Sequence, residues 1–410
     1  MALALLINLH RKMIFASGLN CKSYTRVPST ACTWQLTFRV DNPASTGIKN
    51  SMHRSFYVFT ILALFCASPL QAAAKKLIEF GWDEPDTPYM KEHIQQMEKT
   101  PFDGCVFHIK YKRPNGSHGD FIWEAWSKRA FHEDELKEAL DDLKQTKFRK
   151  FKYNFLRFNT VPGDVDWFGD YSAITNNARL VARIAKSGRV RGILFDIEQY
   201  GTQLFDFHKQ VDKSKSWDEY AAQARLRGRE VMTAFQSEFS DVVIFLTFGY
   251  SLPWVQSGQG KKPLADCNYG LLAPFLDGML DTAGKKVRFV DGHELSYGFR
   301  EPQQFEKAYR MMKSELLPIV AEPKKYADHF SLGFGIWMDN SRHKLGWSTN
   351  DFGKNYFTPE AYAASLRNAV QHADEYVWVY TEAPRWWDKQ GNSQNLPEVY
   401  ERGTRGARGK

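Results

Sequence analysis

The stretch RGILFDIEQYG, residues 191–201, joins a run of apolar residues to two carboxylates. Its first half predicts a buried β-strand. Because side chains alternate along a strand, Asp196 and Glu198 project to the same side as Leu194. Buried carboxylates cost free energy unless they are paired or take part in chemistry. The stretch therefore predicts a core strand that ends at a functional site.

Similar apolar runs recur along the chain and alternate with helical patterns. The predicted strands are residues 76–82, 102–111, 151–159, 190–198, 241–250, 287–294, 330–339 and 375–382. The predicted helices cover residues 89–99, 132–145, 172–188, 217–239, 269–280, 302–320 and 358–373. A helix after the last strand is expected to be weak or absent.

This alternation predicts an α/β fold with a parallel sheet, and eight such units predict a closed (β/α)8 TIM barrel. The alternative is an open, doubly wound sheet. That fold would carry a glycine-rich turn after its first strand, and FGWDEPD, residues 80–86, is not such a turn.

The N-terminal part of the chain differs from the rest. Residues 52–74 have a basic start, an apolar run and three final alanines, the pattern of a secretory signal peptide, and the run is short for a membrane span. We expect a secreted or periplasmic protein that starts near Lys75 and has no stable membrane span after cleavage. Residues 1–51 lack periodicity, and we expect either a segment upstream of the true start at Met52 or a disordered leader.

Charge and cysteine content limit the partners. The chain has a formal net charge of +8, but residues 1–74 and 401–410 carry the excess of Lys and Arg. Residues 75–400, the expected barrel, are near neutral, so no nucleic-acid partner is expected. Residues 401–410 are expected to form a disordered basic tail. Only Cys105 and Cys267 lie beyond the signal segment, so no disulfide framework is predicted. The sequence gives no indication of the oligomeric state.

Acidic side chains stand at the ends of several predicted strands. In a barrel the carboxyl ends of the strands surround the active site, whereas purely structural strand ends more often carry turn residues. The acids expected to line one cavity are Asp196, Glu198, Asp291, Glu294, Asp339 and Glu382. His293 stands among them, although a lone histidine is more often structural.

Aromatic residues gather at the same strand ends, and about half of them are expected to pack between barrel and helices. Flat rings beside carboxylates suit a sugar, whose C–H face stacks while its hydroxyls bond polar groups. A carbohydrate is therefore the expected partner. The residues predicted to bind it are Trp82, Asp83, Glu84, Tyr200, Tyr250, His293, Glu294, Trp337, Tyr380 and Trp386.

The acids suggest glycosidic cleavage, which needs one protonated carboxyl group and a second carboxylate. Glu198 is the predicted acid, since aromatic neighbours raise a carboxyl pKa; its alternative role is an ion pair with an arginine. Glu382 is the first candidate for the second carboxylate and Asp339 the next, while Asp196 with Asp291 forms an alternative pair. No cofactor or metal is predicted, because residues 76–82 lack the His-x-His of metal hydrolases.

The run FDIE, residues 195–198, resembles the end of the D-x-E signature of family 18 chitinases and related barrels. That resemblance implies that Glu198 is the acid and that Asp196 orients an N-acetyl group, although Leu194 and Arg191 replace further family Asp residues. The chain also resembles α-galactosidase-like and α-glucosidase-like barrels, which implies an Asp196 nucleophile and an Asp291 acid. Together these resemblances imply a (β/α)8 glycoside hydrolase without specifying a family. The alternative is a barrel that binds carbohydrate without cleaving it, which would need the aromatics but not the crowded acids.

Overall fold

The structure, a computed structural model, describes residues 75–82, 84–341 and 346–408. These residues belong to one unit, Pro69–Lys410. The expected leader, the expected signal peptide and Asp83 lie outside the described residues. None of the helices in the described ranges is both long and apolar enough to cross a bilayer.

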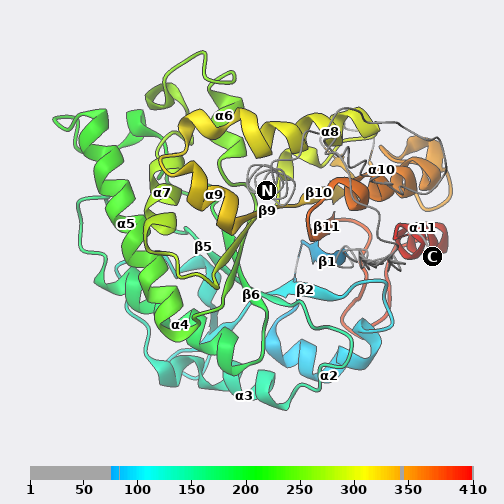
Figure 1. The fold of residues 1–410 in the computed structure, drawn as a ribbon. Helices are drawn as coiled ribbons and strands as arrows, with labels where there is room; N and C mark the ends of the chain where they lie inside the picture. Colours follow the sequence, from blue (N-terminus) through cyan, green and yellow to red (C-terminus); the bar gives the residue numbers. More distant parts are fainter. Residues whose placement is uncertain (1–74, 83, 342–345, 409–410) are drawn as a thin grey trace, which may run out of the picture. The chain divides into compact units, whose positions relative to one another are not determined.

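The described residues form one parallel sheet of nine strands (Figure 1). Its strands are β1 (Lys76–Gly81), β2 (Gly104–Phe107), β5 (Phe155–Asn159), β6 (Gly192–Asp196), β7 (Val243–Leu246), β8 (Arg288–Asp291), β9 (Phe330–Leu332), β10 (Phe334–Trp337) and β11 (Tyr376–Thr381). Each runs parallel to its neighbours in the order β10-β11-β1-β2-β5-β6-β7-β8-β9.

The sheet closes through its seventh predicted strand. Gly333 alone separates β9 from β10; β9 pairs with β8, whereas β10 pairs with β11. The pair therefore acts as one strand that joins the two ends of the sheet. The predicted (β/α)8 barrel is confirmed, with a strand in each of the eight predicted places. A short antiparallel hairpin, β3 (Lys110–Lys112) and β4 (His118–Asp120), follows β2.

Helices alternate with the strands and surround the barrel (Figure 1). They are α2 (Thr87–Met97), α3 (Lys137–Gln145), α4 (Ser172–Ser187), α5 (Trp217–Glu238), α6 (Ser251–Gln256), α7 (Leu272–Thr282), α8 (Pro302–Arg310), α9 (Pro323–His329), α10 (Pro359–His372) and α11 (Glu398–Gly406). The short helices α6 and α9 were not predicted.

Local sequence explains where the longest helix starts and how closely it packs. Ser216 caps α5, because its hydroxyl accepts the Glu219 N–H while the Glu219 side chain accepts the Ser216 N–H. On the packed face of α5, a Cβ at Gly228 would lie 2.0 Å from the Phe275 carbonyl oxygen of α7. A side chain there would push the two helices apart, so glycine sets their close approach.

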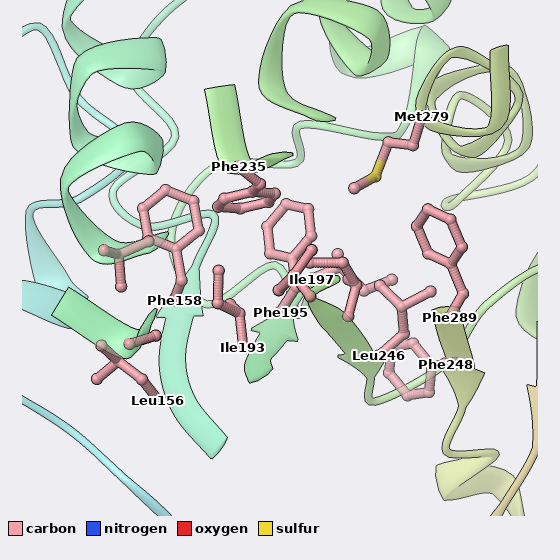
Figure 2. Close-up of a cluster of buried hydrophobic side chains, with 14 of the residues drawn as sticks. Leu156, Phe158, Ile193, Phe195, Ile197, Phe235, Leu246, Phe248, Met279 and Phe289 are labelled. Carbon is pink, nitrogen blue, oxygen red and sulfur yellow. The ribbon is translucent and has the colours of Figure 1, made fainter. Parts of the chain in front are cut away.

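The strands separate two apolar layers. Side chains that point outward pack against the helices, as Figure 2 shows for Leu156, Phe158, Ile193, Phe195, Leu246 and Phe289 with Phe235 of α5 and Met279 of α7. The alternate residues fill the barrel interior. They include Ile78, Phe80, Val106, Phe155, Leu194, Val243, Phe245, Val290, Trp337, Tyr376 and Trp378. This alternation decides which strand-end residues reach the cavity described below.

The C-terminal residues are ordered where a disordered tail was expected. Helix α11 covers Glu398–Gly406, and it buries Tyr400 and Thr404. The Thr404 hydroxyl lies 3.1 Å from the Tyr362 hydroxyl of α10, and Arg408 pairs with Asp103 at 2.7 Å. The prediction of disorder is therefore wrong for residues 401–408. The prediction relied on the basic composition of this segment and overlooked that Tyr400 and Thr404 are spaced to lie on one face of a helix.

Candidate active site

A cavity of about 390 Å³ lies at the carboxyl ends of the barrel strands. Every strand position of the barrel contributes to it, together with the segment after β4. The lining residues are Phe80, Gly81, Trp82, Glu84, His108, Asp120, Ile122, Trp123, Arg157, Glu198, Tyr200, Thr247, Glu294, Tyr297, Trp337, Tyr380 and Glu382. The volume falls in the range typical of small-molecule sites.

Eight of the residues predicted from the sequence line this cavity. They are Trp82, Glu84, Glu198, Tyr200, Glu294, Trp337, Tyr380 and Glu382. Strand alternation explains the grouping: Leu194 fills the barrel interior, so Glu198, four residues later, points the same way above it.

Asp291 and His293 do not line the cavity, and the expectation that they do is wrong. Val290 points into the barrel, so Asp291 points outward. Its buried carboxylate accepts hydrogen bonds from the Ser251 hydroxyl at 3.1 Å and the His293 N–H at 3.0 Å. The His293 ring is also buried, 6.0 Å from the ring of Phe334 in the outer layer. Asp291 therefore supports the start of α6, and the His293 ring packs in the outer layer.

Tyr250 and Trp386, predicted to bind sugar, also lie in the outer layer. The Tyr250 hydroxyl donates to Asp277 Oδ1 of α7 at 2.8 Å. The Trp386 ring meets Phe102 edge to face at 4.6 Å. Both residues follow strands as expected, but the chain after each strand bends away from the barrel mouth, so their rings pack in the outer layer. The predictions for these two residues are wrong.

Arg157 of β5 holds two of the predicted acids. Its guanidinium donates from Nη1 to Glu84 Oε1 at 2.8 Å and from Nη2 to Asp196 Oδ2 at 2.6 Å, and all three side chains are buried. Burial alone would lower the pKa of Arg157, but Glu84 and Asp196 together raise it well above its ordinary value. Asp196 thus lies behind the cavity wall in an ion pair, and the expectation that it lines the cavity is wrong. Sequence reasoning missed Arg157, although a lone charge inside the apolar strand FLRFN was a signal.

Glu198 lies next to this ion-pair cluster and faces the cavity. Its backbone N–H donates to Asp196 Oδ1 at 3.0 Å, and the Tyr200 hydroxyl donates to Glu198 Oε2. The same hydroxyl lies 3.2 Å from Asp196 Oδ2. Although the residue as a whole is half exposed, desolvation of its hydroxyl between Asp196 and Glu198, and then the charges of these two acids, raise the pKa of Tyr200 above its ordinary value. Tyr200 therefore stays protonated and can hold the Glu198 carboxylate in place.

Across the cavity, Glu382 is held by Asp339, which lies just behind the wall and does not line the cavity as expected. Asp339 is buried, and its carboxylate accepts hydrogen bonds from the backbone N–H groups of Glu382 (3.1 Å) and Ala383 (2.8 Å) and from Trp337 Nε1 (3.1 Å). Burial raises the pKa of Asp339. Burial, and then the Asp339 carboxylate, raise the pKa of Glu382. A carboxyl group in this setting is suited to carry a proton.

Two tyrosines form a hydroxyl-bearing wall beside the glutamates. The rings of Tyr297 and Tyr380 stack at 5.4 Å, and the Tyr380 hydroxyl donates to Glu382 Oε1 at 3.3 Å. Burial, and then the charge of Glu294, raise the pKa of Tyr297. Burial, and then the charge of Glu382, raise the pKa of Tyr380. Both hydroxyls therefore remain donors at neutral pH, beside the side chains that line the cavity.

The side of the cavity near β2 and the hairpin was largely missed by sequence reasoning. His108 lies there, with Nδ1 3.7 Å from Glu84 Oε1 and Nε2 3.8 Å from Asp120 Oδ1. Trp123, in the 3-10 turn Phe121–Trp123 after β4, lines the cavity, whereas Trp126, three residues later, is buried in the outer layer. Only long-range folding places this hairpin over the barrel end, so no local pattern identifies these residues.

Acids and a histidine line the cavity, but the arrangement of those that the structure describes does not form a metal site. Within the described ranges, no group of three or more His, Cys, Asp or Glu side chains is arranged to hold a metal ion. Cys105 and Cys267 are buried free thiols and do not line the cavity.

The chain was compared with known proteins. No protein-family model matches it, and no curated protein matches it. Similar solved structures include a glycoside hydrolase family 5 enzyme from Prevotella bryantii (TM-score 0.43, 9% identity, 82% of this chain and 97% of that chain). They also include a putative chitinase A from Streptomyces coelicolor (TM-score 0.38, 9% identity, 82% and 98%).

A further similar structure is an O-GlcNAc hydrolase mutant from Thermobaculum terrenum (TM-score 0.41, 9% identity), where the match covers 76% of this chain and 55% of that one. The chain thus spans about half of that protein. The solved structures that the chain resembles include glycoside hydrolases, as the sequence resemblance implied. At TM-scores below 0.5 these similarities carry no argument about the reaction, which depends on the residues of the cavity.

Proposed function

We propose that the protein is a glycoside hydrolase that cleaves a glycosidic bond in an oligo- or polysaccharide by carboxylate acid–base catalysis. One observation carries the proposal: Glu198, Glu294 and Glu382 line a single cavity at the carboxyl ends of the barrel strands. Tyrosine side chains and three tryptophan rings among the described residues line the same space. Hydroxyl donors, carboxylates and aromatic faces are the groups that a sugar needs, and a pair of carboxyl groups is what glycoside hydrolysis needs.

The surroundings of the two glutamates favour different roles. Burial and the neighbouring Asp339 raise the pKa of Glu382, which suits it to donate a proton to the leaving oxygen. Glu198 accepts a hydrogen bond from Tyr200, which stabilises its ionised form and suits a nucleophile or general base. We therefore propose Glu382 as the acid and Glu198 as the second carboxylate, the reverse of the roles that the sequence suggested. Glu294 is then placed to bind substrate hydroxyls.

Substrates with different leaving groups test both the activity and the roles. The leaving group of a dinitrophenyl glycoside, dinitrophenolate, departs without being protonated. The sugar that leaves from a natural oligosaccharide must receive a proton from an acid. Glu382→Gln is expected to lose about 100-fold or more in kcat on oligosaccharides while keeping most of its rate on the dinitrophenyl glycoside. Glu198→Gln is expected to lose activity on both, and the exposed Glu306→Gln of α8 serves as the matched control.

The first measurement is release of reducing ends by the wild type across a broad glycan panel. Binding of glycans without release of reducing ends would reject the enzyme and favour a carbohydrate-binding barrel. Equal losses for the two variants on both substrate types would reject the assignment of roles. We also propose that residues 52–74 direct export, so that the protein acts on carbohydrate outside the cytoplasm; the signal-peptide pattern supports this proposal.

A further inference from the structure

Three large aromatic side chains around the cavity are exposed. Trp82, Trp123 and Tyr200 are 59%, 44% and 47% exposed, and they come from the end of β1, from the 3-10 turn Phe121–Trp123 and from the segment after β6. We call these three residues the aromatic rim. Scattered exposed rings need no explanation, but three rings that converge on one cavity from separate segments mark a binding surface.

The rim adjoins the glutamates without overlapping them. Tyr200 connects the two regions: its hydroxyl donates to Glu198, and its ring meets Trp123 edge to face at 5.7 Å and 77°. The buried Trp337 and the half-buried Tyr380 lie with Glu382 at the ends of β10 and β11. The cavity thus has one aromatic surface beside Glu382 and another beyond Glu198.

The polar groups near the rim suit sugar hydroxyls. His108 lies within 3.8 Å of Asp120, and both side chains line the cavity on the side of Trp123. Together they offer donors and acceptors next to a ring on which the C–H face of a sugar can stack.

The charges of the lining disfavour anionic sugars. Among the described lining residues, Glu84, Asp120, Glu198, Glu294 and Glu382 are acidic. Arg157 is the fixed cation among them, and it already pairs with Glu84 and with Asp196 behind the wall. Like charges brought together oppose binding, so a uronate or sulfated sugar is disfavoured and a neutral sugar is accommodated.

We propose that the aromatic rim is a second sugar-binding position and that the ligand is a neutral oligosaccharide of two or more units. One unit lies between Glu198 and Glu382, and the next stacks on Trp123 beside Tyr200 and Trp82. This inference rests on the proposed function for the position of the scissile bond: with Glu382 as the acid, that bond lies on the Glu382 side of the first unit, and the rim binds the unit on the other side. The binding that it predicts is measurable without turnover.

Titration calorimetry with neutral oligosaccharides of one to six units tests the inference. The probes are β-1,4-linked glucose, mannose and N-acetylglucosamine series, with oligogalacturonate as the anionic comparison. The wild type is expected to bind at least one neutral series with an affinity that rises from one unit to two or three. Trp123→Ala is expected to weaken binding of the longer members about 10-fold, the loss of one aromatic contact.

Phe168→Ala is the matched control, because Phe168 is 40% exposed and does not line the cavity. It is expected to bind every probe as the wild type does. Thermal unfolding of each variant checks that the fold is intact, and Trp82→Ala replaces Trp123→Ala if the latter does not fold. No gain of affinity with length, or equal binding by Trp123→Ala and Phe168→Ala, would overturn the inference, as would tighter binding of oligogalacturonate.

Hydrolysis measured in parallel separates this inference from the proposed function. Length-dependent binding that Trp123→Ala weakens, without any release of reducing ends, would reject the glycosidase and keep the rim as a binding site. Hydrolysis by the wild type with length-independent binding would keep the glycosidase and reject the rim.

Discussion

The buried carboxylate of Asp339 accepts the backbone N–H of Glu382 at 3.1 Å, and so couples the end of β10 to the candidate acid at the end of β11. The same carboxylate accepts the Trp337 indole N–H. One side chain behind the wall therefore fixes both a glutamate and an aromatic ring that line the cavity. Its charge also contributes to the raised pKa of Glu382.

Replacing Asp339 by Asn is expected to move the basic limb of the pH–rate profile. The candidate acid Glu382 works only while protonated, so its raised pKa extends activity toward higher pH. Removing the Asp339 charge lowers the pKa of Glu382, and the basic limb of kcat/KM shifts to lower pH. The exposed Asp328→Asn of α9 is the control. An unmoved limb in Asp339→Asn would show that Glu382 is not the acid.

The Arg157 ion pairs are expected to be important for stability. Arg157→Met leaves the buried Asp196 without its cationic partner, which costs about 3–5 kcal/mol when a buried pair is broken. Arg310→Met removes an exposed pair with Glu315, whose loss costs about 0–1 kcal/mol. Urea unfolding at neutral pH compares the two free energies of unfolding. A cost for Arg157→Met no larger than that of the control contradicts the prediction.

Glu79 of β1 points away from the barrel interior and is buried, and this burial raises its pKa well above the ordinary value. A raised pKa in the folded state means that the folded protein holds the proton more tightly than the unfolded chain. The Glu79 contribution is therefore fully present below the unfolded pKa of about 4.3 and is lost as pH rises toward the folded pKa.

Glu79→Gln removes this titration. The variant is expected to gain stability relative to the wild type as pH rises above about 4.3, by about 1.4 kcal/mol for each unit of pKa shift. Urea midpoints at several pH values measure the difference. A difference that is constant with pH would mean that Glu79 titrates normally in the folded protein.

The candidate pair predicts the stereochemistry of cleavage. Glu198 follows the fourth strand and Glu382 the eighth, and these strands lie opposite each other in an eight-stranded barrel. Such a pair favours the inverting separation of about 6.5–9.5 Å over the roughly 5 Å of a retaining pair. Proton NMR of the first product is therefore expected to detect the inverted anomer. A retained anomer would exclude the inverting Glu198–Glu382 scheme.

Processing is tested independently of activity. The alanines at 72–74 are expected to precede the cleavage site, so the exported protein should start near Lys75. N-terminal sequencing of the exported protein measures this directly. Residues 1–51 present on that protein would contradict the prediction.

The barrel could be predicted from the sequence because each strand is a local apolar run and most helices show apolar residues at helical spacing. The site was predicted only where strand alternation was applied correctly. Counting from Leu194 puts Glu198 in the cavity, and counting from Val290 puts Glu294 there while turning Asp291 outward. The sequence prediction treated all acids at strand ends alike and did not consider that neighbouring side chains on a strand point to opposite sides, so it placed Asp291 in the cavity.

Other site residues depend on contacts between segments far apart in sequence. Arg157 reaches Glu84 across 73 positions, and Trp123 reaches Tyr200 only after the β3–β4 hairpin folds over the barrel end. Tyr250 and Trp386 stand at similar places in their units, yet the chain turns them into the outer layer. Sequence periodicity describes single elements, so it does not contain this information.

The parallel pairing of β1 with β11, from Lys76↔Tyr376 to Gly81↔Thr381, has a consequence for biosynthesis. β1, the first strand among the described residues, has one neighbour early, β2, but its other edge has no native partner until almost the whole chain has been made. An unpaired apolar edge is prone to association with other chains. The barrel therefore closes only after β11 has been synthesised. Under the export proposed above, a chain kept unfolded until it has left the cytoplasm would not expose that edge there.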